Sequence, residues 1–129
     1  ILQSSLKIDI YGRGCRYYDA MDPRICGEFT SKQPYENYQF HICIENYQKP
    51  HYFSEKISDA LLCSTSPIYL GCHNIDTYFP GNVICLTGSI EKDMQLLHNI
   101  VNDPIKYRTL IDPAEIIETL SIVNVVNMF

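Results

Sequence analysis

The sequence feature that most constrains the fold is a strand-like run, apolar on both faces, that leads through a polar loop into a helix. Residues 38–45 read Tyr-Gln-Phe-His-Ile-Cys-Ile-Glu and are largely apolar toward their end, as is typical of a buried parallel strand. Ser54 is a plausible N-cap, and the apolar spacing of residues 55–62 predicts a helix after it. The next strand is predicted at residues 67–70. This strand–helix–strand order favours an α/β protein.

The rest of the chain continues this alternation. Residues 7–11 and 82–86 are predicted strands, whereas residues 12–36 hold three Gly and two Pro and are predicted to be mostly loop. The pattern therefore predicts a mainly parallel sheet layered with helices. Ligands of such sheets bind at the carboxyl ends of the strands. The segments that follow these ends are 12–16, 45–56 and 71–77.

The C-terminal third is predicted to be helical. One amphipathic helix starts at Ser89, a short one starts at Pro104, and the last runs over residues 113–127. The residues of the first helix that we expect to face inward are Met94, Leu97, Ile100 and Val101. The last helix is apolar nearly all round, so we expect it to pack against a further domain or a second copy of the chain.

Length and composition narrow the function classes. The chain has 129 residues, which at about 150 residues per domain indicates one domain. Its net charge of −5 makes it a poor candidate for binding nucleic acid or an anionic membrane. No apolar run reaches the roughly 20 residues of a membrane-spanning helix. Because the sequence starts at Ile1 and not at Met, we expect a processed product or a fragment of a longer protein.

The six cysteines and four histidines do not suggest a metal site. No Cys-x-x-Cys pair is present, and the histidines are not spaced four apart. Cys43, Cys63 and Cys85 are predicted to be small buried residues, not parts of a disulfide framework. His41 is predicted to be a hydrogen-bonded residue of the sheet.

The densest polar cluster is residues 45–56, between the buried strand and the helix start. Unpaired N–H groups and the positive end of the helix dipole favour a phosphate there. Lys56 in the first turn is at the wrong end for the dipole, which is explained if an anion binds in front of it. Glu55 is suited to capping or to accepting hydrogen bonds from a sugar diol, and Tyr52 to stacking on a base or a sugar. The alternative is an ordinary solvated helix start with Tyr52 at the edge of the core.

A second glycine-rich turn, Gly12-x-Gly14, follows the first predicted strand. It lacks the third glycine of a dinucleotide-binding fingerprint. Arg13 and Arg16 beside it either meet a phosphate or are solvated loop charges.

Several spaced blocks together resemble glycosyltransferase family 10, the α-1,3/1,4-fucosyltransferases. The blocks are Asp-Ile-Tyr-Gly at 9–12, residues 38–46, Tyr-Phe-Ser-Glu-Lys with its helix at 52–60, and Pro-Ile-Tyr-Leu-Gly at 67–71. The match extends over about residues 7–86. Departures from the family pattern are Ile44 for Phe, Phe53-Ser54 for Val-Thr, and Cys72-His73.

The resemblance implies a Rossmann-like α/β domain that is the C-terminal, donor-binding half of a GT-B enzyme. Such an enzyme transfers fucose from GDP-fucose to a glycan acceptor with inversion and without an obligatory metal. We expect the acceptor domain, which carries the general base in the family, to lie outside this chain. Residues 1–129 are thus expected to be one GDP-sugar-binding domain with little activity alone, because a positioned general base contributes about 10²–10⁴-fold to rate.

By position, Asn46, Tyr52, Glu55 and Lys56 match the donor-binding signature of the family. The resemblance implies that Lys56 meets the diphosphate, and that Glu55 contacts the sugar or ribose and stabilises positive charge on the fucosyl ring. Glu45 matches the family's glutamate and is a further donor-binding candidate, with a structural role as the alternative.

Arg13 is a further donor-binding candidate, although it does not match the family's diphosphate-facing arginine cleanly. Two other functions stay open: a GT-B transferase that uses another nucleotide sugar, and a non-catalytic nucleotide-sugar-binding or assembly module. The resemblance implies a cytoplasmic location for a viral or bacterial member. It implies the Golgi for an animal-type anchored enzyme, of which this chain would be a soluble fragment.

Overall fold

The chain folds into two parts that are each built on parallel strands. The computed structural model describes residues 1–19, 21–30 and 32–121. The first part holds β1 (Ile10–Tyr11), the 3₁₀ helix η1 (Arg13–Tyr17) and β2 (Ile25–Gly27). The second part consists of β3 (Phe40–Ile44), α1 (Glu55–Leu62), β4 (Ser66–Leu70), η2 (Ile75–Thr77), β5 (Ile84–Cys85), α2 (Ile90–Asn102), α3 (Pro104–Tyr107) and α4 (Pro113–Leu120).

The strands form two sheets. β3, β4 and β5 are parallel neighbours in that order, with Ile42 opposite Ile68 and Ile68 opposite Ile84. β1 pairs with β2, also in parallel, and is not hydrogen-bonded to β3. The predicted α/β class with parallel strands is therefore confirmed, although the strands are divided between two sheets.

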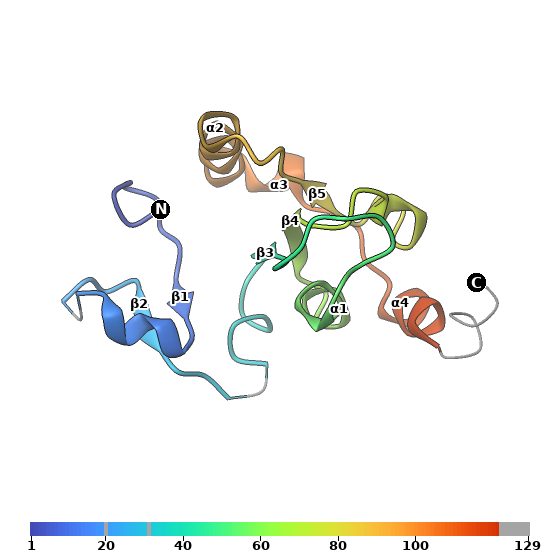
Figure 1. Cartoon of the computed structure of the whole chain (residues 1–129), viewed down its shortest axis with the longest axis horizontal. Helices are drawn as coiled ribbons and strands as arrows, with labels where there is room; N and C mark the ends of the chain where they lie inside the picture. Colours follow the sequence, from blue (N-terminus) through green and yellow to red (C-terminus); the bar gives the residue numbers. More distant parts are fainter. Residues whose placement is uncertain (20, 31, 122–129) are drawn as a thin grey trace.

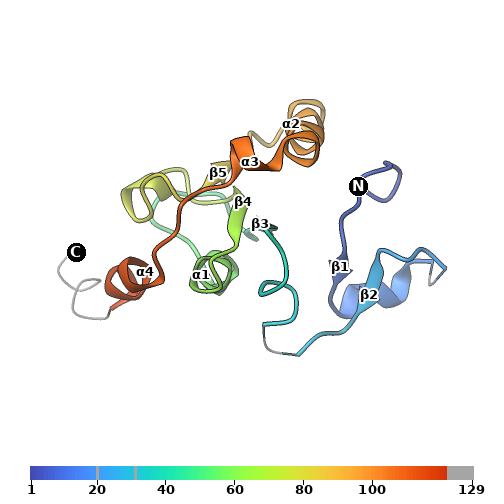
Figure 2. The same cartoon turned by 180° about the vertical axis from the view of Figure 1, so that it is seen from behind.

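Helices cover both faces of the three-stranded sheet (Figures 1 and 2). α1 and α4 lie on one face, and α2 and α3 on the other. Successive side chains of a strand point to opposite faces, so Tyr69 of β4 joins the core under α1 and Ile68 joins the core under α2. The fully buried residues of the first core include Ile57, Leu61 and Phe79.

The region predicted to be mostly loop, residues 12–36, contains η1 and β2. Neither element has a hydrophobic period, and β2 is held in place by Arg24. Its guanidinium donates hydrogen bonds to the carbonyls of Leu2, Ser4 and Leu6, and it pairs with Asp22 at 2.8 Å. Hydrogen bonds from Arg24 lower the pKa of Asp22 to about 2.

Three predictions about single residues have different outcomes. Cys43 is buried as predicted, but Cys85 is exposed because β5 is an edge strand of two residues. Val101 was predicted to face inward and is 48% exposed, because it lies about 100° round the helix from the buried Ile100.

Other predictions concern His41 and the last helix. His41 lies in the sheet as predicted, with Nδ1 3.2 Å from the carbonyl oxygen of Pro34, and burial lowers its pKa. α4 ends at Leu120, capped by Ser121. The predicted continuation over residues 122–127 lies outside the described residues. Ile117 of this helix is 62% exposed, and the partner predicted for the helix stays a prediction.

α1 ends in a Schellman motif. The Thr65 N–H donates to the Ala60 carbonyl, and the Ser64 N–H donates to the Leu61 carbonyl. Ser64 has φ of 56°, a left-handed conformation that glycine adopts without strain. The motif ends the helix directly before β4.

We predict that Ser64→Gly stabilises the protein. The left-handed backbone costs a residue other than glycine about 1–2 kcal/mol, and the greater freedom of glycine in the unfolded chain offsets part of that gain. Urea denaturation should show a free energy of unfolding higher by about 0.5–1 kcal/mol. Ser58→Gly, inside α1, should lower it. An unchanged or reduced stability for Ser64→Gly would contradict the strain.

Candidate functional site

A buried carboxylate joins the end of β3 to the start of α1. The Glu45 side chain has no exposed surface. It accepts hydrogen bonds from the Ser54 N–H at 2.9 Å, from the Ser54 hydroxyl at 2.7 Å and from the Tyr69 hydroxyl at 3.4 Å. A buried charge is tolerated only when it is paired and hydrogen-bonded. The loop between β3 and α1 is therefore closed onto Glu45.

The end of β4 packs against the same carboxylate. A Cβ added at Gly71 would lie 2.5 Å from the Tyr69 hydroxyl and would also collide with the Glu45 side chain. The Cys72 N–H donates to the Tyr69 hydroxyl at 3.0 Å, and burial raises the pKa of this phenol. The close contact requires glycine at position 71, which is the last residue of the sequence block 67–71.

The start of α1 is a well-formed helix N-terminus. Ser54 is extended, and its hydroxyl accepts a hydrogen bond from the Lys56 N–H at 3.3 Å. Glu55 is exposed in the first turn, where its negative charge interacts favourably with the positive end of the helix dipole. The predicted N-cap is thereby confirmed.

Lys56 has an internal partner that the sequence analysis missed. Its ammonium nitrogen lies 3.7 Å from Glu45 Oε2, and 36% of the side chain is exposed. The Glu45 carboxylate thus offsets part of the electrostatic repulsion between this lysine and the positive end of the helix dipole. The side chain of Lys56 is thus only partly covered by the protein. The feature of the sequence that indicates this ion pair is Glu45, the glutamate at the end of the predicted strand, eleven residues before Lys56.

Aromatic contacts hold the loop between β3 and α1. The rings of Tyr47 and Tyr52 meet edge to face with centroids 6.0 Å apart, and Lys49 Nζ lies 5.3 Å from the Tyr52 centroid. Tyr47 is 65% exposed and Tyr52 is half-buried. Asn46 is exposed at the end of β3.

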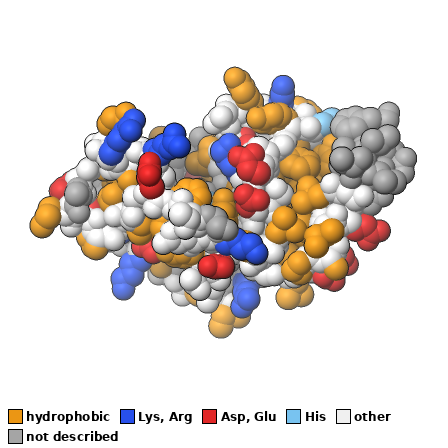
Figure 3. Space-filling view, turned by 90° about the horizontal axis from the view of Figure 1, so that it is seen from below, with side chains coloured by type: hydrophobic (Ala, Val, Ile, Leu, Met, Phe, Trp, Pro, Cys, Tyr) orange, Lys and Arg blue, Asp and Glu red, His pale blue; other side chains and the backbone are white. Residues whose placement is uncertain are grey.

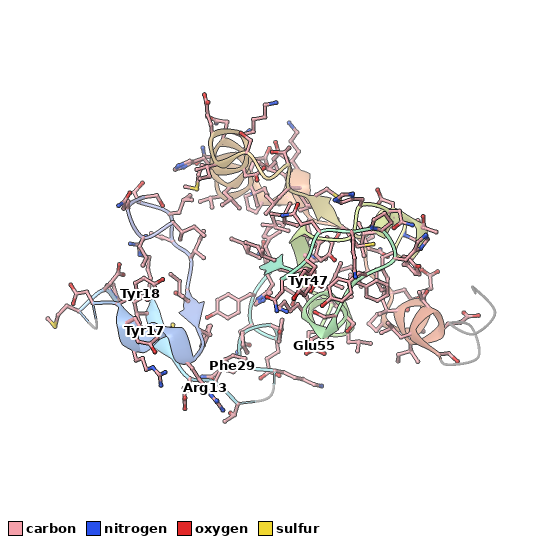
Figure 4. All side chains as sticks on the ribbon, viewed as in Figure 1. Arg13, Tyr17, Tyr18, Phe29, Tyr47 and Glu55 are labelled. Atoms are coloured by element: carbon pink, nitrogen blue, oxygen red, sulfur yellow. The ribbon has the colours of Figure 1, made fainter. Side chains whose placement is uncertain are left out.

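The structure brings together five of the six predicted donor-site residues. They come from the end of β3, the loop after it and the first turn of α1: Glu45, Asn46, Tyr52, Glu55 and Lys56. Arg13 lies in η1, apart from Glu55 in Figure 4, with its guanidinium 3.7 Å from the Glu28 carboxylate. Arg13 follows β1, and β1 pairs with β2 and not with β3, which is why it is not at this site.

Three residues at the same strand ends were not singled out by sequence reasoning. His51 in the loop after β3 contacts Asn74 and Tyr78, which follow β4. They are 23 and 27 residues away along the chain. No local motif announces such a pairing. The sequence pattern did predict that the segments after both strands meet at one edge of the sheet, and these contacts lie between those two segments.

The distributions of charge and of metal-ligating side chains give little support to other classes of site. Figure 3 shows Lys and Arg side chains scattered over one face among hydrophobic and acidic groups. Among the described residues, no cluster of three or more metal-ligating side chains is found. No helix in the described part of the chain is long and apolar enough to cross a membrane.

A parallel sheet with helices on both faces defines an α/β protein, a class in which ligands bind at the carboxyl ends of the strands. Comparison with protein families makes this specific. The model of the family described as Glycosyltransferase family 10 (fucosyltransferase) C-term matches residues 1–109. The chain therefore belongs to glycosyltransferase family 10, whose C-terminal domain it represents. Searches among curated proteins and among solved structures find no match.

We predict that Gly71→Ala is destabilising and also disturbs the site. The added methyl group must displace Tyr69 or Glu45, and overpacking of this kind costs about 1–3 kcal/mol. Thermal and urea unfolding measure the loss. Gly14→Ala is the matched control, because a Cβ there meets nothing within 4 Å. Equal stability of the two variants would contradict the close packing at Gly71.

Proposed function

We propose that this chain is the donor-binding domain of an inverting fucosyltransferase-like enzyme that moves fucose from GDP-fucose to a glycan acceptor. The observation that carries the proposal is the buried Glu45 carboxylate, which fixes Ser54 and Lys56 at the start of α1. Membership of the fucosyltransferase family supports the class of reaction and of donor. In this proposal the glycan acceptor and the general base belong to another domain of the enzyme.

Each residue of the site has a proposed role. The α1 N-terminus and the Lys56 ammonium bind the diphosphate, because the positive end of the helix dipole and a cation both favour phosphate oxygens. Glu55, exposed in the first turn, accepts hydrogen bonds from the sugar or ribose hydroxyls and stabilises positive charge on the fucosyl ring. Asn46 and Tyr52 line the nucleotide-sugar pocket. We leave Arg13 out of the site, because it lies in the β1–β2 part of the chain.

The net charge of −5 is compatible with an anionic ligand. The acidic side chain nearest to Lys56 is Glu45, whose charge is already satisfied by its donors. Glu55 points from the exposed side of the first turn (Figure 4). The phosphate site is thus a local feature of one helix end and does not depend on the charge of the whole protein.

We predict that Lys56→Ala weakens GDP binding by about 10–100-fold. A hydrogen bond to a charged group contributes about 1.5–3 kcal/mol, and 1.4 kcal/mol is tenfold in affinity. Calorimetric titration with GDP measures the change. Lys92→Ala is the matched control, because Lys92 is an exposed lysine in the first turn of α2. Equal GDP affinity in Lys56→Ala and the wild type would reject the assignment of Lys56.

We also predict that GDP-fucose raises the melting temperature more than GDP, UDP or GDP-mannose does. A ligand that binds only the folded state stabilises it in proportion to the logarithm of its concentration over Kd. A thermal-shift screen at one ligand concentration ranks the four. A higher rank for another nucleotide sugar would indicate a transferase with that donor. No shift with any of them would contradict nucleotide-sugar binding and favour an assembly module.

A further inference from the structure

The residues proposed for the donor site carry more negative than positive charge. Glu45 and Glu55 are acidic, and Lys56 is basic. The Lys56 ammonium is already paired with the Glu45 carboxylate at 3.7 Å, and the end of the helix dipole adds only about half a positive charge. A diphosphate carries a negative charge on each phosphate, so a further cation near the helix end would stabilise the bound form.

Lys49 is the other basic residue of the segment 45–56. It is exposed, and its Nζ lies 5.3 Å from the ring centroid of Tyr52 and 6.0 Å from that of Tyr47. Aromatic rings attract an ammonium group without neutralising its charge. In the part of the chain that the structure describes, no carboxylate pairs with Lys49. Its positive charge is therefore available to an anionic ligand.

The contact with Tyr52 brings this ammonium group close to the start of α1. Tyr52 comes two residues before the N-cap Ser54, and two residues of extended chain span at most about 7 Å. The rings of Tyr47 and Tyr52 also contact each other. Pro50 restricts the backbone of Lys49 to extended conformations. The lysine is thus positioned from its backbone and from its ammonium end.

We propose that Lys49 is a second cation of the site and binds the diphosphate of the nucleotide sugar together with Lys56. The inference rests on the proposed function. Lys56 is a cation that Glu45 fixes and partly neutralises, whereas the charge of Lys49 is not offset in this way. Because an ammonium group donates in several directions, the N–H groups that face away from the rings can donate to phosphate oxygens. Tyr47 and Tyr52 are positioning residues for Lys49.

The test compares Lys49→Gln with Lys106→Gln in calorimetric titrations with GDP. Lys106 is a matched control, because it is also exposed and its Nζ lies 5.4 Å from the ring centroid of Tyr107. It belongs to α3, which covers the opposite face of the sheet from α1 (Figures 1 and 2). We expect Lys49→Gln to bind GDP about 3–10-fold more weakly, between the loss of an exposed ion pair and that of a buried hydrogen bond to a charged group. Lys106→Gln should bind GDP like the wild type.

Three further measurements separate a role of the charge from a structural role. Lys49→Arg keeps the positive charge and should bind GDP like the wild type. Added salt should weaken GDP binding less in Lys49→Gln than in the wild type, because salt screens exposed charges. NMR titration with guanosine, which has no phosphate, should give the same affinity for Lys49→Gln and the wild type.

The possible failures differ in what they overturn. GDP affinity in Lys49→Gln equal to the wild type would overturn the role of Lys49, while a loss in Lys56→Ala leaves the proposed function in place. The role of Lys49 would also be overturned by an equal loss in Lys49→Arg or Lys106→Gln, or by an unchanged salt dependence in Lys49→Gln. An equal loss for guanosine and GDP would overturn the assignment to the diphosphate. A wild-type protein that binds no GDP would overturn the proposed function, and the role of Lys49 with it.

Discussion

The arrangement of the candidate site depends on the burial of one carboxylate, that of Glu45. A fully buried charge must be compensated within the protein, and here the donors come from the N-cap of α1, from β4 and from Lys56. The end of β3, the start of α1 and β4 are thereby fixed to each other at one edge of the sheet. The glycine at position 71 follows from the same constraint, because no side chain fits between Glu45 and Tyr69.

Local patterns in the sequence predicted the elements that bury their own apolar residues. β3, α1, β4 and α2 lie where periodicity and capping placed them, since each is decided by neighbours a few residues away. The pairing of β1 with β2 was not predictable in this way. It depends on Arg24, whose partners are carbonyl groups 18 to 22 residues earlier in the chain.

The candidate site shows the same division. Residues 45–56 were predicted as a unit because they follow a buried strand and precede a helix, and five of the six expected residues lie there. The ion pair of Lys56 with Glu45 was missed. A lysine in a first turn indicates a nearby anion, but its position does not distinguish a bound ligand from a carboxylate of the protein. The contacts of His51 with Asn74 and Tyr78 join two loops, and only the fold brings them together.

Family membership coincides in this chain with a particular arrangement of side chains. The chain belongs to a fucosyltransferase family, and its described residues place a capped helix and a lysine at the end of β3. In the proposed function, this arrangement binds phosphate through donors that are fixed before the ligand arrives. The affinity then does not have to offset the ordering of the loop, since Glu45 and the aromatic contacts have already ordered it.

The central claim is that the nucleotide binds at the start of α1, and NMR titration with GDP tests it most directly. In a uniformly ¹⁵N-labelled sample, the account predicts that the largest amide shifts occur at Asn46, Glu55 and Lys56. Saturable shifts confined to β1, η1 and β2, with the α1 amides unchanged, would contradict it.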